Sequence, residues 1–154
     1  AWSMKRFRFR LEVLLGVRRR KCDEAKLALA EASRRVQETV DDLRKLWEER
    51  TEAMAWFTAQ QSQGKLTAAV LPLYDAYQIS SYNRERELVV EKEARELARQ
   101  DCLLKLEEAV KQLKAVETLK ETQYQQYLYE SLLEEQKILD EIGMQLYLRE
   151  EGER

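Results

Sequence analysis

The stretch that decides the fold of this 154-residue chain is Leu15–Phe57, LGVRRRKCDEAKLALAEASRRVQETVDDLRKLWEERTEAMAWF. Along it, one stripe of positions recurs with steps that alternate strictly between three and four, and ten of its thirteen residues are apolar. The stripe consists of Leu15, Arg18, Cys22, Ala25, Leu29, Ala32, Val36, Thr39, Leu43, Leu46, Arg50, Ala53 and Phe57. A repeat of about 3.5 residues stays on one side of a helix only when that helix winds around a partner. The stretch therefore predicts a long helix in a coiled coil.

The composition also favours long helices over a compact globule. Charged residues make up 36% of the chain, which has four glycines and one proline, a profile typical of coiled coils. The net charge of −2 gives no general attraction to nucleic acids or membranes. Histidine, the commonest general base and metal ligand, is absent from the sequence, as is any glycine-rich phosphate loop. We expect no catalytic residue, no metal site, no cofactor and no enzymatic activity.

Two helices joined by one turn are expected, in a single coiled-coil domain over residues 4–154. Residues 1–3, before the first methionine, are interpreted as a cloning remnant. The first helix should run from about residue 11 to 63, because Gly64 can adopt the left-handed conformation that ends a helix. Pro72 is tolerated only in the first turn of a helix, so the turn should cover about 64–71 and the second helix about 72–149. A short connection makes the two helices antiparallel. The expected fold is all-α, a long antiparallel two-helix coiled-coil hairpin with a longer second helix.

The apolar face of the second helix changes near Tyr127. Before that point it comprises Leu88, Ala98, Cys102, Leu106, Ala109, Leu113 and Val116. After that point it comprises Leu128, Leu132, Leu139, Ile142 and Leu146. Equal counting from the turn places Leu11 opposite residues 119–124, so about 25–30 residues, or about 40 Å of helix, should overhang the first helix. An apolar face without a partner inside the chain implies one outside it. The alternative is a frayed C-terminal helix.

Aromatic residues gather on both sides of the turn and basic residues gather at the N-terminus. Trp56, Tyr74 and Tyr77 should lie near the tip of the hairpin, where they either form an interface or pack against each other. The two cysteines, Cys22 and Cys102, should stay unbridged. Equal counting separates them by roughly 10 Å or more along the helices, whereas a disulfide requires α-carbons within about 7 Å.

Three segments of the chain carry distinctive motifs. MKRFRFRLEVLLGVRRRKCDEAKLALAEA, residues 4–32, has a basic and aromatic opening that leads into an alanine-rich helix. GKLTAAVLPLYDAYQISS, residues 64–81, has a turn sequence followed by a tyrosine-containing helix start. EEQKILDEIG, residues 134–143, contains the pattern Glu-Gln-Lys-x-x-Asp-Glu. The three segments resemble the opening, the Gly-Leu-Thr turn and the C-terminal signature of the flagellar export protein FliJ family. Their order matches the family over the whole chain, whereas Pro72 and Gly143 depart from its pattern.

The resemblance implies a non-enzymatic central stalk of the flagellar type III export ATPase. The end with both termini would enter the hexameric ATPase ring, and the tip would reach the export gate membrane protein and handle export chaperones. The ring-binding residues would be Arg6, Arg8, Arg10, Leu128, Leu132, Leu139, Ile142 and Leu146. The residues for the gate or a chaperone would be Trp56, Tyr74 and Tyr77. Such a protein is expected to be cytoplasmic, monomeric in isolation, and peripheral at the cytoplasmic face of the inner membrane when assembled.

Three other functions fit parts of the pattern. The chain could be the equivalent stalk of a virulence type III secretion system, which shares parts of the same ends. It could be a structural coiled-coil scaffold that dimerises through the overhang, in which case sedimentation should show a lasting dimer. It could also bind nucleic acid through the basic start, with Phe7 or Phe9 stacking on bases. The positive charge fades after Lys21, which argues against nucleic acid.

Overall fold

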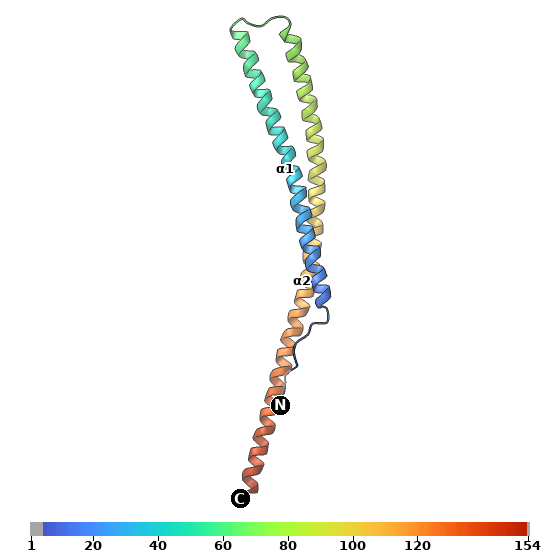
Figure 1. Cartoon of the computed structure of the whole chain (residues 1–154), viewed down its shortest axis with the longest axis vertical. Helices are drawn as coiled ribbons and strands as arrows, with labels where there is room; N and C mark the ends of the chain where they lie inside the picture. Colours follow the sequence, from blue (N-terminus) through green and yellow to red (C-terminus); the bar gives the residue numbers. More distant parts are fainter. Residues whose placement is uncertain (1–4, 154) are drawn as a thin grey trace. The chain divides into compact units, whose positions relative to one another are not determined.

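The computed structural model describes residues 5–153, so the three residues interpreted as a cloning remnant lie outside the described range. The chain forms two α-helices, α1 (Glu12–Ser62) and α2 (Val70–Gly152), of 51 and 83 residues (Figure 1). It divides into a turn unit, Asp23–Glu108, and a terminal unit, Ala1–Cys22 with Ala109–Arg154. Within each unit, α1 and α2 run antiparallel. The predicted fold class, an all-α antiparallel hairpin with a longer second helix, is confirmed.

The ends of the helices follow local chemistry. Gly64 has a φ of +66°, in the left-handed region that favours glycine, and the amide of Lys65 donates to the carbonyl of Gln60 at 3.0 Å. α2 begins at Val70, two residues before the expected start, so that Pro72 lies in its first turn. It continues through Gly143 and ends three residues later than expected. Both cysteines are free thiols, as predicted.

The predicted stripe of α1 is the face that packs against α2. All thirteen of its positions are buried or half-buried, from Leu15 in the terminal unit to Phe57 in the turn unit. Leu43 and Val36 are buried apolar residues of this face, and Thr39 is fully buried although it is polar. The 3.5-residue repeat therefore identified the packed face of α1 over its whole length.

In the turn unit, the face of α2 that packs against α1 is largely polar. This α2 seam comprises Tyr74, Gln78, Ser81, Glu85, Leu88, Lys92, Arg95, Arg99, Cys102 and Leu106, all buried or half-buried, with steps alternating between four and three. The prediction that Ala98 belongs to the packed face is wrong, because Ala98 is exposed and Arg99 occupies the neighbouring seam position. A count of apolar residues misses this face, since long polar side chains bury their stems and keep their charged ends solvated.

Arg50 joins the two helices of the turn unit through one polar layer. Its Nε donates to Ser81 Oγ at 3.0 Å, and its Nη2 donates to Glu85 Oε2 at 2.8 Å. The guanidinium carbon lies 4.2 Å from the centre of the Tyr82 ring, within the range of a cation–π contact. The indole N–H of Trp47 donates to the other Glu85 oxygen at 3.0 Å. The layer therefore links Trp47 and Arg50 of α1 to Ser81 and Glu85 of α2 by hydrogen bonds.

Arg95 forms a second polar layer in the same unit. Its Nη1 donates to the backbone carbonyl of Arg35 at 2.8 Å and to Thr39 Oγ1 at 2.9 Å. The guanidinium also lies 3.6 Å from a carboxylate oxygen of Glu38 and 2.7 Å from one of Glu91. The buried hydroxyl of Thr39 thus accepts a hydrogen bond from the opposite helix and donates one to the Arg35 carbonyl of its own helix at 3.2 Å, which satisfies it as a buried polar group.

The terminal unit has a small core at the start of α1. Phe9, Leu15 and Val116 form a buried cluster, and Leu113 packs against it. Lys120 Nζ lies 2.9 Å from a carboxylate oxygen of Glu12. This pair agrees with the expectation that the start of the first helix lies opposite residues 119–124.

Candidate protein interaction surfaces

Most of the residues predicted to contact partners lie at exposed positions. Within residues 5–153, no three potential metal-ligating side chains come together. No helix in that range is long and apolar enough to cross a bilayer. The candidate sites are the three regions that contain these residues: the N-terminal segment, the end of α2, and the surface around the turn.

The N-terminal segment, residues 5–10, is non-helical and packs its aromatic residues on α2. Phe9 is part of the buried cluster, and the ring of Phe7 lies 5.2 Å from that of Tyr124 and 5.5 Å from that of Tyr127. The Tyr127 hydroxyl donates to the carbonyl of Lys5. Because alternate residues of an extended chain point to opposite sides, packing of the phenylalanines leaves the intervening arginines outside.

The three predicted basic residues of this segment are accordingly exposed: Arg6, Arg8 and Arg10. Their positive charge continues into α1 with Arg18, Arg19, Arg20 and Lys21. Phe9 is buried and Phe7 is half-buried against two tyrosine rings, so stacking on a base would compete with contacts inside the protein. This packing argues against a nucleic-acid-binding function.

The overhang of α2, residues 128–152, exposes most of the predicted apolar face. From Leu132 to Gly152 every residue is exposed except Ile138, which is half-buried. Of the five predicted face residues, Leu128 is half-buried, and the other four, Leu132, Leu139, Ile142 and Leu146, are exposed. A helix of this length with an exposed apolar face has few intramolecular contacts to hold it, and such faces mark protein interaction sites.

Charge in the terminal unit is separated between its two exposed regions. Residues 5–21 carry eight cationic side chains and one carboxylate, Glu12. The overhang carries seven carboxylates and two cationic side chains, Lys137 and Arg149. A partner that covers both regions must therefore present negative charge to the N-terminal segment and positive charge beside the overhang.

Of the three aromatic residues predicted at the tip, Trp56 is the most accessible, at 53% exposed. Tyr74 is half-buried, and its ring stacks on that of Phe57 at a centroid distance of 4.2 Å. Its hydroxyl also accepts a hydrogen bond from Gln78 at 3.1 Å. Tyr77 is half-buried as well. Tyr74 thus has a structural contact, whereas Trp56 faces solvent.

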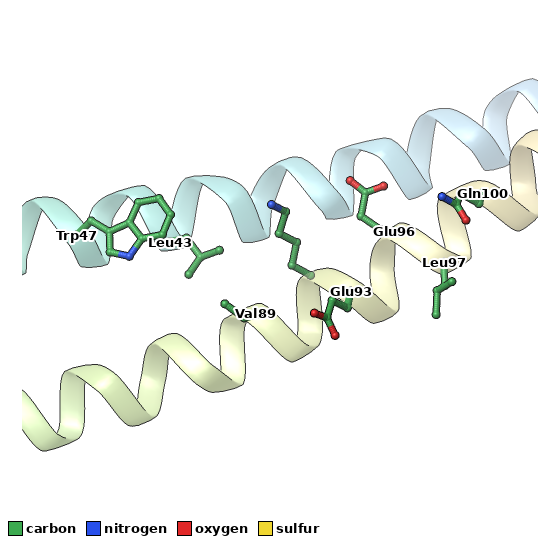
Figure 2. A pocket seen from close by; sticks show the side chains of 8 residues that line it. Leu43, Trp47, Val89, Glu93, Glu96, Leu97 and Gln100 are labelled. Carbon is green, nitrogen blue, oxygen red and sulfur yellow. The ribbon is translucent and has the colours of Figure 1, made fainter.

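Sequence reasoning missed two further apolar regions of the turn unit. Leu71 and Leu73 are exposed on either side of Pro72, and their signal was a Leu-Pro-Leu sequence at a helix start. A groove between the helices is lined by Leu43 and Trp47 of α1 and by Val89 of α2, with acidic residues nearby (Figure 2). Its signal was Leu97, which also lines the groove. Leu97 forms, with Val90 and Leu104, a seven-residue repeat that lies off the predicted face.

The Glu85 layer gives the turn unit a defined response to acid. The indole of Trp47 and then the guanidinium of Arg50 hold the pKa of Glu85 below its usual value. Because this pKa is lower in the folded than in the unfolded chain, the associated stabilisation is complete above the ordinary glutamate pKa and is lost as the pH falls below it. We expect Glu85→Gln to remove part of the acid-induced fall in melting temperature between about pH 5 and pH 3.

Glu93→Gln is the matched control for this titration. Glu93 lies one heptad plus one residue further along α2, and in the described part of the chain it forms no ion pair. Melting curves followed by circular dichroism should show a wild-type pH profile for this variant. Identical profiles for the two variants would mean that the Glu85 layer does not contribute to stability.

Comparison with known proteins assigns the family. The model of the family described as "Flagellar FliJ protein" matches residues 7–152 of the 154-residue chain. Neither the curated proteins nor the solved structures gave a significant match. The family match spans both helices, the turn, the packed phenylalanines and the whole overhang. The chain therefore belongs to the flagellar FliJ protein family and is a component of the flagellar type III export apparatus.

Proposed function

We propose that this protein is the non-enzymatic central stalk of the flagellar export ATPase complex and couples the hexameric ATPase ring to the export gate. The observation that carries the proposal is the overhang, where four leucine and isoleucine side chains of one helix face are exposed beyond the start of α1. An apolar face of this kind is stable in an assembly when a partner covers it. The ring is the partner that the family assignment favours.

The arginines of the N-terminal segment support the same orientation. They lie in the same unit as the overhang. Their backbone is fixed because the neighbouring side chains of Phe7 and Phe9 pack against the rest of that unit. A fixed positive surface can recognise acidic loops that line the channel of a ring, with little loss of conformational entropy on binding. We assign Arg6, Arg8 and Arg10 to this contact, together with the overhang residues Leu128, Leu132, Leu139, Ile142 and Leu146.

The turn end is assigned to the export gate and to export chaperones. Trp56 is exposed there, and tryptophan is among the residues that contribute most to protein interfaces. Tyr74 and Tyr77 complete the proposed contact and have part of their surface available. In this arrangement the protein acts in the cytoplasm and becomes peripheral to the inner membrane when the complex assembles.

Reversing the N-terminal charges should weaken binding to the export ATPase. We expect Arg6→Glu/Arg8→Glu/Arg10→Glu to lower the affinity roughly tenfold at low ionic strength and less at high salt. Binding and stimulation of ATP hydrolysis would be measured with the purified ATPase. The matched control, Lys26→Glu/Lys45→Glu/Arg86→Glu, makes the same change of charge at exposed positions of the turn unit. Equal losses in the two variants would show that net charge matters rather than the site.

Single substitutions at the tip should separate binding from packing. Trp56→Ala is expected to weaken binding to the cytoplasmic domain of the gate protein and to leave the melting temperature nearly unchanged, because the indole is exposed. Tyr74→Ala should lower the melting temperature, because it removes the stacking on Phe57, worth about 0.5–1.5 kcal/mol. Binding that survives both substitutions would locate the gate or chaperone contact elsewhere.

The scaffold alternative rests on the same overhang. If two copies covered each other's apolar faces, sedimentation of the isolated protein would give a dimer that persists on dilution. A monomer that binds the ATPase would support the stalk. The equivalent role in a virulence secretion system would be recognised by binding to the ATPase of that system instead of the flagellar one.

A further inference from the structure

In the turn unit, α2 turns its less apolar side toward α1. The α2 seam has only two apolar residues, Leu88 and Cys102, among its eight positions from 78 to 102. A second face has the same alternating spacing, at positions 79, 83, 86, 90, 93, 97, 100 and 104, and four of these eight are large and apolar. These four, which we call the α2 ridge, are Ile79, Val90, Leu97 and Leu104.

The α2 ridge faces solvent. Its four side chains are 64–68% exposed, and Figure 2 shows Leu97 pointing away from α1. In a helix that follows a 3.5-residue repeat, the more apolar face is the one that normally packs against the partner. The apolar stripe of α1 would accept the ridge. Apolar burial alone therefore favours a different rotation of α2 about its axis.

The two polar layers are what favour the observed rotation. Arg50 bonds from α1 to two residues of the α2 seam, and Arg95 bonds from α2 to the carbonyl of Arg35 and the buried hydroxyl of Thr39. If the ridge faced α1, Arg50 would lose both of its α2 partners, and its guanidinium would lie against apolar side chains without a hydrogen bond. Arg95 would turn toward solvent and lose its two bonds to α1, and Thr39 would keep only the bond that it donates to the Arg35 carbonyl. An unpaired buried polar or charged group is strongly unfavourable.

We propose that Arg50 and Arg95 are positioning residues that lock the rotation of α2 and so keep the α2 ridge on the outside of the turn unit. Buried polar groups contribute little net stability but can fix which of several packings a coiled coil adopts. Here the alternative packing is provided by the chain itself, as a second face of the same helix. This inference does not depend on the proposed function.

Two single-cysteine probes report the rotation directly. Both natural cysteines are replaced by alanine, and one chain carries Leu97→Cys on the ridge while another carries Leu88→Cys on the seam. With both arginines present, a soluble thiol reagent should label position 97 rapidly and position 88 more than roughly tenfold more slowly. In Arg50→Ala/Arg95→Ala chains we expect the order of the two rates to reverse.

The matched control removes two arginines that bond only within α1. Arg34 pairs with Glu31 and Glu38, and Arg44 pairs with Asp41, so Arg34→Ala/Arg44→Ala should keep the original order of rates. An unchanged order in the Arg50→Ala/Arg95→Ala chains would overturn the proposal. Fast labelling at both positions would also overturn it, because it would indicate local opening rather than rotation.

A second variant excludes a general loss of structure. Val90→Gln/Leu104→Gln makes the ridge polar and removes the reason for α2 to rotate. Introduced into the Arg50→Ala/Arg95→Ala chains, these substitutions should restore slow labelling at position 88 and fast labelling at position 97. If position 88 stays accessible in the four-substitution chain, the arginines maintain folding rather than rotation, and the proposal fails.

Discussion

Replacing Leu139 and Ile142 with aspartate is expected to abolish binding to the export ATPase and to leave the melting temperature of the hairpin nearly unchanged. The two side chains are 61% and 49% exposed, so the folded chain gains little from them. Burying each on a partner would contribute about 1.5–3 kcal/mol before the costs of association. Each aspartate would also place a charge in that apolar contact. Both effects predict a loss of affinity of more than roughly a hundredfold.

The control adds the same two carboxylates beside the apolar face. Gln136→Asp/Gln145→Asp changes two exposed polar residues of the overhang and should retain most of the affinity. Binding would be measured by calorimetry or by stimulation of ATP hydrolysis, and folding by circular dichroism. A large fall in melting temperature with ATPase binding retained would show that the face packs internally. In that case our account of the overhang would be wrong.

Leu15→Ala should produce the largest loss of stability in the terminal unit. Leu15 is fully buried against Phe9 and Val116, and truncating a buried leucine costs about 2–5 kcal/mol, depending on how far the cavity collapses. Because the same cluster holds Phe9, we expect the N-terminal segment to detach from α2. Hydrogen exchange should then show loss of protection in the first turns of α1.

Leu27→Ala is the natural comparison, because it makes the same truncation on the same helix. Leu27 is 72% exposed, and substitutions at such positions usually change stability by less than about 0.5 kcal/mol. Similar melting temperatures for the two variants would mean that the cluster around Leu15 is not a core. The ATPase affinity of Leu15→Ala should also fall, because the arginines would lose their fixed positions.

The sequence pattern was sufficient to identify the packed face of α1, but not the packed face of α2 in the turn unit, and the difference has one physical reason. A repeat of apolar residues identifies a packed face when the face is apolar, as from Leu15 to Phe57. In the turn unit the opposing face is made by Ser81, Glu85 and Arg95, which pack because they pair across the seam. Pattern counting treats such residues as solvent-facing and therefore misplaced Ala98.

The three polar residues of the α1 stripe indicated that the facing side of α2 is polar. Arg18, Thr39 and Arg50 interrupt an otherwise apolar pattern, and each has a polar partner on α2. Arg18 donates to Gln112, Thr39 accepts from Arg95, and Arg50 pairs with Glu85. Polar residues that interrupt an apolar stripe therefore indicate polar partners on the facing helix.

Of the candidate surfaces, the overhang was the more predictable. Its exposure follows from the lengths of two uninterrupted helices, and helix length is easily derived from stop signals such as Gly64. The accessible surface of the tip depends on which aromatic rings pack against each other. Tyr74 stacks on Phe57, and the spacing of aromatic residues in the sequence does not determine which of the rings pack together.

The two polar layers also affect whether α1 or α2 can pair with helices of other proteins. A bacterial cell contains many amphipathic helices that could exchange with α1 or α2 during synthesis. A foreign helix that offered only leucine and valine would leave Arg50 without its hydrogen bonds and Thr39 without the bond from Arg95. Apolar contact does not recover the cost of the unpaired guanidinium. The polar residues of the two layers thus reduce the apolar contact within the hairpin but also disfavour pairing with helices that lack matching polar groups.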